Sequence, residues 1–133
     1  MAARPDPSLE NLAGMCRRNA VHVVKLAWTA HPHIGFDRAG VRWLDRYIEH
    51  NRSALTNELT TEFVQFMGCF YGECLIAEFG GRWEWSSDQL GVRMDRLGFT
   101  YPFNAVTRQI EVGRFASVAA SFLTAVEYLA DAA

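Results

Sequence analysis

Residues 57–85 read NELTTEFVQFMGCFYGECLIAEFGGRWEW, and this stretch decides the fold. Apolar side chains recur three or four residues apart along 57–79, which is the period of an α-helix. They occupy nearly every side of that helix, which is typical of a central helix covered by other elements. Gly80 and Gly81 then favour a helix end, because glycine adopts positive φ readily. The stretch therefore predicts a buried central helix over about 57–79.

One face of this helix is expected to be apolar along its whole length, at Leu59, Phe63, Phe66, Met67, Phe70, Cys74 and Ala77. Gly68 and Gly72 lie four residues apart on the same helix. Each glycine costs a helix interior about 1 kcal/mol relative to alanine. We expect that cost to be offset by close packing of another element against the two glycines.

Glu73 is the candidate site residue of this helix, because its neighbours in sequence are predicted core residues. A carboxylate in that position needs a polar partner. Arg82 and Trp83, just past the turn, are the candidates. A structural, hydrogen-bonded glutamate is the favoured interpretation, and a catalytic or ligand-binding glutamate is the alternative.

The segment after the double glycine predicts a small antiparallel sheet. Arg82, Trp83, Glu84 and Trp85 alternate charge with aromatic rings, which is the period of a half-buried strand. Residues 86–88 and 95–98 have turn composition, and a second alternating run lies between them. We therefore expect a hairpin or a three-stranded meander over about 82–101.

These motifs resemble a family of small uncharacterised bacterial proteins with a GxxxGE helix, a GGxW turn and a PFxxV segment. The matching positions are Gly68, Gly72, Glu73, Gly80, Gly81, Trp83, Pro102, Phe103, Val106 and Gly113. The resemblance covers about residues 37–127 and includes an upstream helix over 41–52. It departs after Gly113, where the family pattern has an acidic residue before the serine and this chain has Arg114-Phe115-Ala116-Ser117. The resemblance implies a fold unit and carries no established reaction.

Four further helices are predicted on either side of this unit. Helices over 8–28 and about 37–51 begin at the capping residues Ser8 and Asp37. A short helix over 102–112 begins at Pro102, and Gly113 ends it. The last helix is expected over about 114–131, with an inward stripe at Phe115, Val118, Ala119, Phe122, Val126 and Leu129. It either covers the central helix or faces another subunit as a homodimer.

The predicted fold class is α+β, mainly helical, with about five helices packed with one small antiparallel β-hairpin or meander. At 133 residues the chain is expected to form a single domain over 1–133, with residues 1–7 flexible.

Surface charge gives few signs of a charged partner. The formal net charge is −2, which provides no electrostatic case for nucleic acid or for an anionic membrane. Charged residues on the outer side of the second helix are spaced to pair with one another, at Arg38, Arg42, Asp45, Arg46 and Glu49. His31-Pro32-His33 is expected to be a solvated loop rather than a metal site.

The first residues, MAARPDPSLEN, lack the apolar run of a targeting segment, so a cytoplasmic location is expected. The three cysteines form no CxxC motif, which favours free buried thiols. No cofactor or metal is expected.

The sequence contains no GxSxG, GxxxxGK[ST], GxGxxG or HExxH motif. A non-enzymatic protein-interaction module, of the adaptor or immunity type, is therefore the favoured hypothesis. Its candidate surface is Arg82 and Trp85, since arginine and tryptophan often dominate interface energies. The alternative is a small-molecule-binding protein or minor enzyme, with a pocket anchored by Glu73 and walled by Trp83 and Phe103.

Overall fold

The computed structural model describes residues 8–132, which form five α-helices and one three-stranded sheet. The predicted flexible segment 1–7 lies outside this range. The helices are α1 (Leu9–Trp28), α2 (Arg38–Asn51), α3 (Asn57–Phe79), α4 (Pro102–Val112) and α5 (Val118–Ala132). The strands are β1 (Gly81–Ser86), β2 (Gln89–Met94) and β3 (Gly98–Thr100), and short 3-10 helices lie at Arg52–Ala54 and Gly113–Ala116. The predicted class, mainly helical α+β, is confirmed.

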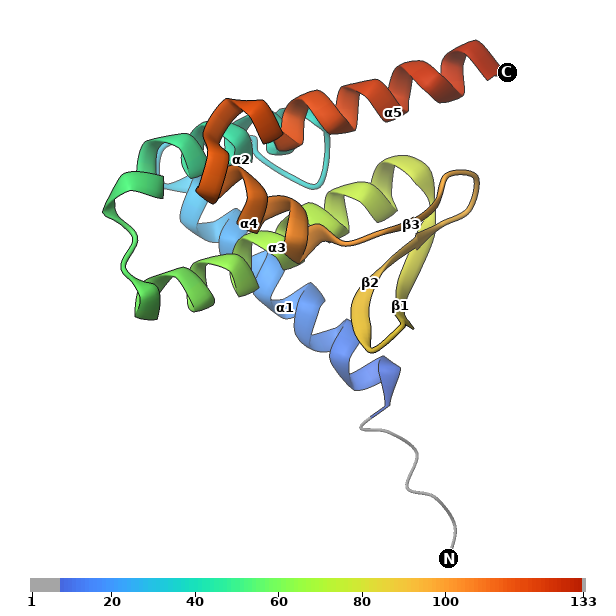
Figure 1. Ribbon diagram of the computed structural model, residues 1–133, viewed down its shortest axis with the longest axis horizontal. Helices are drawn as coiled ribbons and strands as arrows, with labels where there is room; N and C mark the ends of the chain where they lie inside the picture. The colour runs from blue at the N-terminus through green and yellow to red at the C-terminus, as the bar shows by residue number, and fades with distance from the viewer. Residues whose placement is uncertain (1–7, 133) are drawn as a thin grey trace, which may run out of the picture.

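The middle of α3 is the centre of the molecule (Figure 1). Every residue from Met67 to Leu75 is buried, as expected of a helix with apolar side chains on nearly all sides. The two ends of the predicted apolar face behave differently, because fewer elements cover them. Leu59 is 53% exposed and Ala77 is also exposed, so the prediction that they face the core is wrong.

Local capping interactions determine where the first three helices begin. The Ser8 hydroxyl accepts a hydrogen bond from the Asn11 amide, and the Asp37 carboxylate accepts one from the Gly40 amide. The Thr56 hydroxyl caps α3 in the same way and accepts a hydrogen bond from the Leu59 amide. Each oxygen satisfies an amide that has no partner within its helix.

The sheet is a meander in the order β1-β2-β3, with antiparallel pairing throughout. In its register Trp83 lies opposite Val92, and Val92 lies opposite Thr100. Trp83, Val92 and Met94 are buried, while Arg82 and Arg93 are exposed, so one face of the sheet joins the core. The predicted hairpin or meander is confirmed, and it packs against α3.

The chain after Gly113 differs from the prediction. Residues 113–116 form a 3-10 helix, and α5 begins only at Val118, because Ser117 is extended and breaks the run. Phe115 consequently lies outside the last helix and is 98% exposed, so its predicted place in the inward stripe is wrong. Val118 and Phe122 are buried as predicted. Helix α5 lies along α2 and α4, and the Phe122 ring reaches Phe79 at the end of α3.

One cluster of buried apolar side chains includes members from all five helices and from β1 and β2. Residues 8–132 therefore share a single core. Within this range no single helix has the length and apolar composition of a membrane span. Residues 102–116 and 118–132, which are bent by 82° relative to each other, have that length and composition only as a pair.

Candidate functional site

Glu73 projects from the centre of α3 and is only 6% exposed. The Trp83 indole Nε1 donates a hydrogen bond of 2.7 Å to its Oε2, and the Arg17 guanidinium Nη1 donates one of 2.9 Å to its Oε1. Arg17 also lies over the Phe36 ring, 4.6 Å from its centroid. The predicted partner Trp83 is therefore found. The prediction that Arg82 could pair with Glu73 is wrong: Arg82 pairs with Glu84, and the arginine that reaches Glu73 is Arg17 of α1.

The walls of the predicted pocket pack directly on α3. A Cβ on Gly72 would collide with the Trp83 ring, and a Cβ on Gly68 would collide with the Phe103 ring. The two rings are 5.7 Å apart and fill this space. Both Glu73 oxygens are occupied by hydrogen bonds from Trp83 and Arg17. The geometry favours a structural role for Glu73, and the ligand-binding role stays a prediction.

Phe103 has a second environment. With Tyr101, Asn104 and residues 89–90 it lines a cavity of about 200 Å³ beside the sheet. Its ring is only partly buried, so it belongs both to the packing of α4 on α3 and to this small opening.

The predicted interaction residues of the sheet differ in how far they are buried. Trp83 is part of the core at 3% exposed, whereas Trp85 is 44% exposed. Arg82 and Arg93 both pair with Glu84, at 3.2 Å and 3.0 Å. Much of the charge on this part of the sheet is therefore neutralised within the protein.

Residues 112–132, which we call the C-terminal segment, carry several exposed apolar side chains. Four large apolar side chains in it are exposed: Val112 (46%), Phe115 (98%), Leu123 (50%) and Tyr128 (63%). Only three of its residues carry charge, namely Arg114, Glu127 and Asp131. A groove of about 200 Å³ runs between α5 and α2, and Arg38, Arg42 and Leu123 are among its lining residues.

Two polar side chains hold the start of this segment in place. Asp45 of α2 accepts hydrogen bonds from the Ser117 hydroxyl and from the Ala119 amide. Gln109 of α4 is fully buried and accepts a 2.9 Å hydrogen bond from the Val118 amide. The beginning of α5 is thus fixed to α2 and α4, and its apolar outer side chains are presented on a rigid base.

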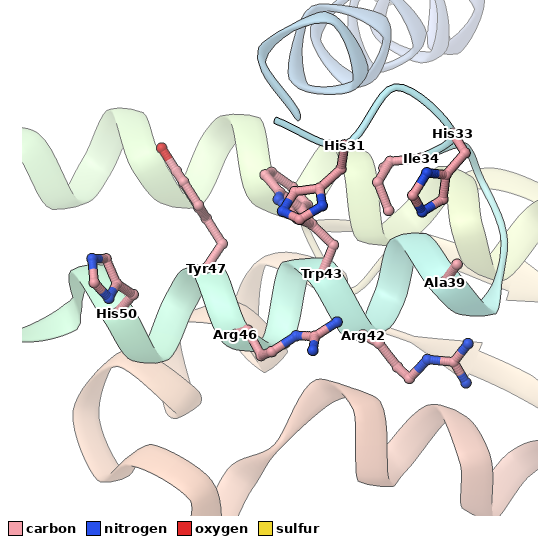
Figure 2. Close-up of a pocket in the computed structure, with 9 residues that line it drawn as sticks. All are labelled: His31, His33, Ile34, Ala39, Arg42, Trp43, Arg46, Tyr47 and His50. Atoms are coloured by element: carbon pink, nitrogen blue, oxygen red, sulfur yellow. The ribbon is translucent and has the colours of Figure 1, made fainter. Parts of the chain in front are cut away.

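A larger cavity, of about 500 Å³, lies over α2 beside the loop that joins α1 to α2 (Figure 2). Its polar lining residues are all basic or imidazole-bearing apart from Tyr47: His31, His33, Arg42, Arg46 and His50. We call it the basic cavity. The sequence prediction that charges on this helix pair with one another is wrong here: Asp45 faces α5, Glu49 lies 3.8 Å from Arg52, and Arg38 pairs with Glu78. No ion pair among residues 8–132 includes Arg42 or Arg46.

The positions of the cysteines and of two histidines bear on metal binding. Cys16, Cys69 and Cys74 are free and buried, as the sequence predicted. The His31 and His33 rings lie 6.4 Å apart, and no group of three histidine, cysteine, aspartate or glutamate side chains within 8–132 is placed to hold a metal ion.

Comparisons of the sequence with family models, with curated proteins and with solved structures found no match. The resemblance to small bacterial proteins with the GxxxGE, GGxW and PFxxV motifs therefore stays a prediction.

Proposed function

We propose that this protein is a non-enzymatic protein-interaction module and that the C-terminal segment is its docking surface. One observation carries the proposal: four of the eight large exposed apolar side chains in residues 8–132 lie on this short, charge-poor segment. Interface cores are depleted in charge and enriched in aromatic residues, and Phe115 and Tyr128 fit that description.

The charges around α5 fit a second copy of the chain as the partner. Glu127 and Asp131 lie near the end of the helix, whereas Arg38 and Arg42 line the groove beside its beginning. Two α5 helices packed antiparallel around a two-fold axis bring the acidic end of each against the basic end of the other. With that axis near Ala125, Asp131 of one copy faces the surroundings of Ala119 in the other.

Small side chains make this packing feasible. Ala120 and Ala130 are exposed on α5, and Ala119 is partly exposed at the groove. Helices approach closely where side chains are small, and Leu123 and Tyr128 then supply the apolar area that an interface needs. The groove has room for about one large side chain from the partner.

Analytical ultracentrifugation of the full chain tests the proposal. We expect a monomer–dimer equilibrium that the double substitution Leu123→Asp and Tyr128→Asp abolishes. Asp131→Arg should weaken the dimer, since it places a positive charge near Arg38 and Arg42. Leu59→Asp is the control, because Leu59 is equally exposed but lies on α3 away from α5.

The sheet surface is tested in the same experiment. Arg82→Ala with Trp85→Ala should leave association unchanged if the C-terminal segment is the docking surface. If this variant lost the dimer and the Leu123→Asp/Tyr128→Asp variant kept it, the interface would lie on the sheet instead. A strict monomer at every concentration would overturn self-association.

A further inference from the structure

The basic cavity carries a second inference, which does not depend on the proposed interaction surface. We propose that it binds a small organic anion carrying a phosphate monoester group. Arg42 and Arg46 supply the permanent charge, and the imidazoles of His31, His33 and His50 supply further hydrogen-bond donors.

The positions of the basic side chains follow from the sequence. Arg42, Arg46 and His50 lie four residues apart, so they form one row along α2. His31 and His33 come from the loop that joins α1 to α2, which passes above α2 in Figure 2. Two elements therefore present basic groups toward one volume, which a solvated helix face alone would not do.

The loop is held in place by its own bonds. The His31 amide donates to the Ala27 carbonyl at 2.8 Å, and the Trp28 indole donates to the Ile34 carbonyl at 2.9 Å. Ile34 is 5% exposed and anchors the loop in the core. The backbone that carries the two histidines is thus held in place before any ligand arrives, which lowers the ordering cost of binding.

The floor of the cavity is equally rigid. The Trp43 ring stacks on Tyr47 with centroids 4.8 Å apart and meets Phe70 edge-on at 5.7 Å. Trp43 is 8% exposed, so it supports the cavity rather than lying free in solvent. An apolar and aromatic floor with a few convergent polar groups is typical of small-molecule sites.

Within residues 8–132, no acidic side chain compensates the charge in the cavity. No acidic side chain lines it, and the acids of α2 are turned to Ser117 and Arg52. Two arginines four residues apart on a helix repel each other. A dianionic phosphate would remove that repulsion, and guanidinium groups match its geometry with paired hydrogen bonds.

The size of the cavity indicates more than an inorganic ion. About 500 Å³ lies within the roughly 300–1,000 Å³ range of small-molecule pockets. The ligand class is therefore a phosphorylated metabolite, in which the phosphate meets the arginines and the remainder covers the aromatic floor.

Calorimetric titration of the full chain with adenosine 5′-monophosphate, ribose 5-phosphate, inorganic phosphate and adenosine tests the inference. At least one of the two organic phosphates should bind, more tightly than inorganic phosphate and in a salt-sensitive manner, while adenosine should not bind. Arg46→Gln should weaken that binding by about tenfold or more, since it removes a charged hydrogen-bond donor. Arg46 is chosen because, unlike Arg42, it does not line the α2–α5 groove.

Arg96→Gln is the matched control, because Arg96 is exposed in the turn between β2 and β3 and forms no ion pair in residues 8–132. It removes the same charge and should change the affinity less than twofold. Arg46→Lys keeps the charge without the planar fork and should give an intermediate loss. Binding of neither organic phosphate, equal binding of adenosine, or equal losses for Arg46→Gln and Arg96→Gln would each overturn the inference.

Discussion

Glu73 shows how one buried carboxylate is stabilised by residues that lie far from it in sequence. Its two oxygens accept from Trp83, ten residues later, and from Arg17, 56 residues earlier. Arg17 is well exposed, so its ion pair is screened by water and is worth less than the buried indole bond. The indole contact is therefore the main interaction to test.

Two substitutions of Glu73 should reduce the free energy of unfolding by different amounts. Glu73→Gln keeps an oxygen acceptor for the indole and should cost about 1 kcal/mol. Glu73→Ala leaves the buried indole N–H without an acceptor and should cost roughly 2–4 kcal/mol. Urea unfolding measures both, and Glu62→Gln, on the exposed part of the same helix, should stay within about 0.5 kcal/mol of the parent.

The opposite result would change the role of this residue. If Glu73→Gln left stability intact and removed the binding of a ligand, Glu73 would be a site residue, as the alternative hypothesis from the sequence states.

At the scale of elements, the two glycines of α3 determine how closely its neighbours approach. The Trp83 ring of β1 occupies the position of a Cβ at Gly72, and the Phe103 ring of α4 does so at Gly68. The helix therefore exchanges some intrinsic helix propensity for contact with both the sheet and α4.

Alanine substitutions of two glycines should have opposite effects. Gly72→Ala gains about 1 kcal/mol in helix propensity but forces the Trp83 ring to move, for a net loss of roughly 1–3 kcal/mol. Gly14→Ala is the matched case, since a Cβ at Gly14 of α1 meets only the end of the Arg18 side chain, at 3.4 Å. It should raise stability by about 0.5–1 kcal/mol. A stabilising Gly72→Ala, measured by thermal and urea unfolding, would contradict the packing described here.

The last helix illustrates the limit of periodicity. Its inward stripe from Val118 onward follows the expected spacing. Phe115 fits the same spacing in the sequence, but in the structure it lies outside the helix and is exposed. The 3-10 turn at 113–116 and the extended Ser117 rotate the chain before α5 begins, because Ser117 and Val118 are held by Asp45 and Gln109. Those contacts join α5 to α2 and α4, so no local pattern reports them.

For the molecule as a whole, buried thiol and phenol groups make the free energy of unfolding depend on pH in the alkaline range. Burial, followed by the charge of Asp37, raises the pKa of the Cys74 thiol above its ordinary value of 9.0. Burial likewise raises the pKa of the Tyr71 phenol above its ordinary value of 10.0. Both groups stay protonated in the folded protein at pH values where the unfolded chain loses the protons.

The Cys74 thiol should therefore lower the free energy of unfolding once the pH exceeds 9.0, and the Tyr71 phenol should lower it further above 10.0. Each of the two groups contributes a slope of about 1.4 kcal/mol per pH unit above its ordinary pKa. Urea unfolding over a series of buffers measures the profile. Cys74→Ala should remove the part contributed by the thiol, and an unchanged alkaline slope in this variant would contradict the assignment.

The sequence by itself determined the helices, the meander and most of their ends, because spacing, caps and glycines act within a few residues. Ser8, Asp37, Gly80 and Pro102 mark their boundaries for local steric and hydrogen-bonding reasons. It also predicted that Glu73 is a buried carboxylate, with Trp83 and Arg82 as candidate partners, of which only Trp83 bonds to it.

Only the tertiary structure decided which charges find partners. Arg17 reaches Glu73 because α1 packs across α3. Asp45 and Glu49 do not pair with the arginines of the basic cavity, because Asp45 bonds to the start of α5 and Glu49 lies next to Arg52. The basic cavity and the exposed C-terminal segment are thus products of how the elements pack. Helical spacing says which side chains share a face, but the free energy of each charge and of each apolar group depends on what the rest of the chain places against that face.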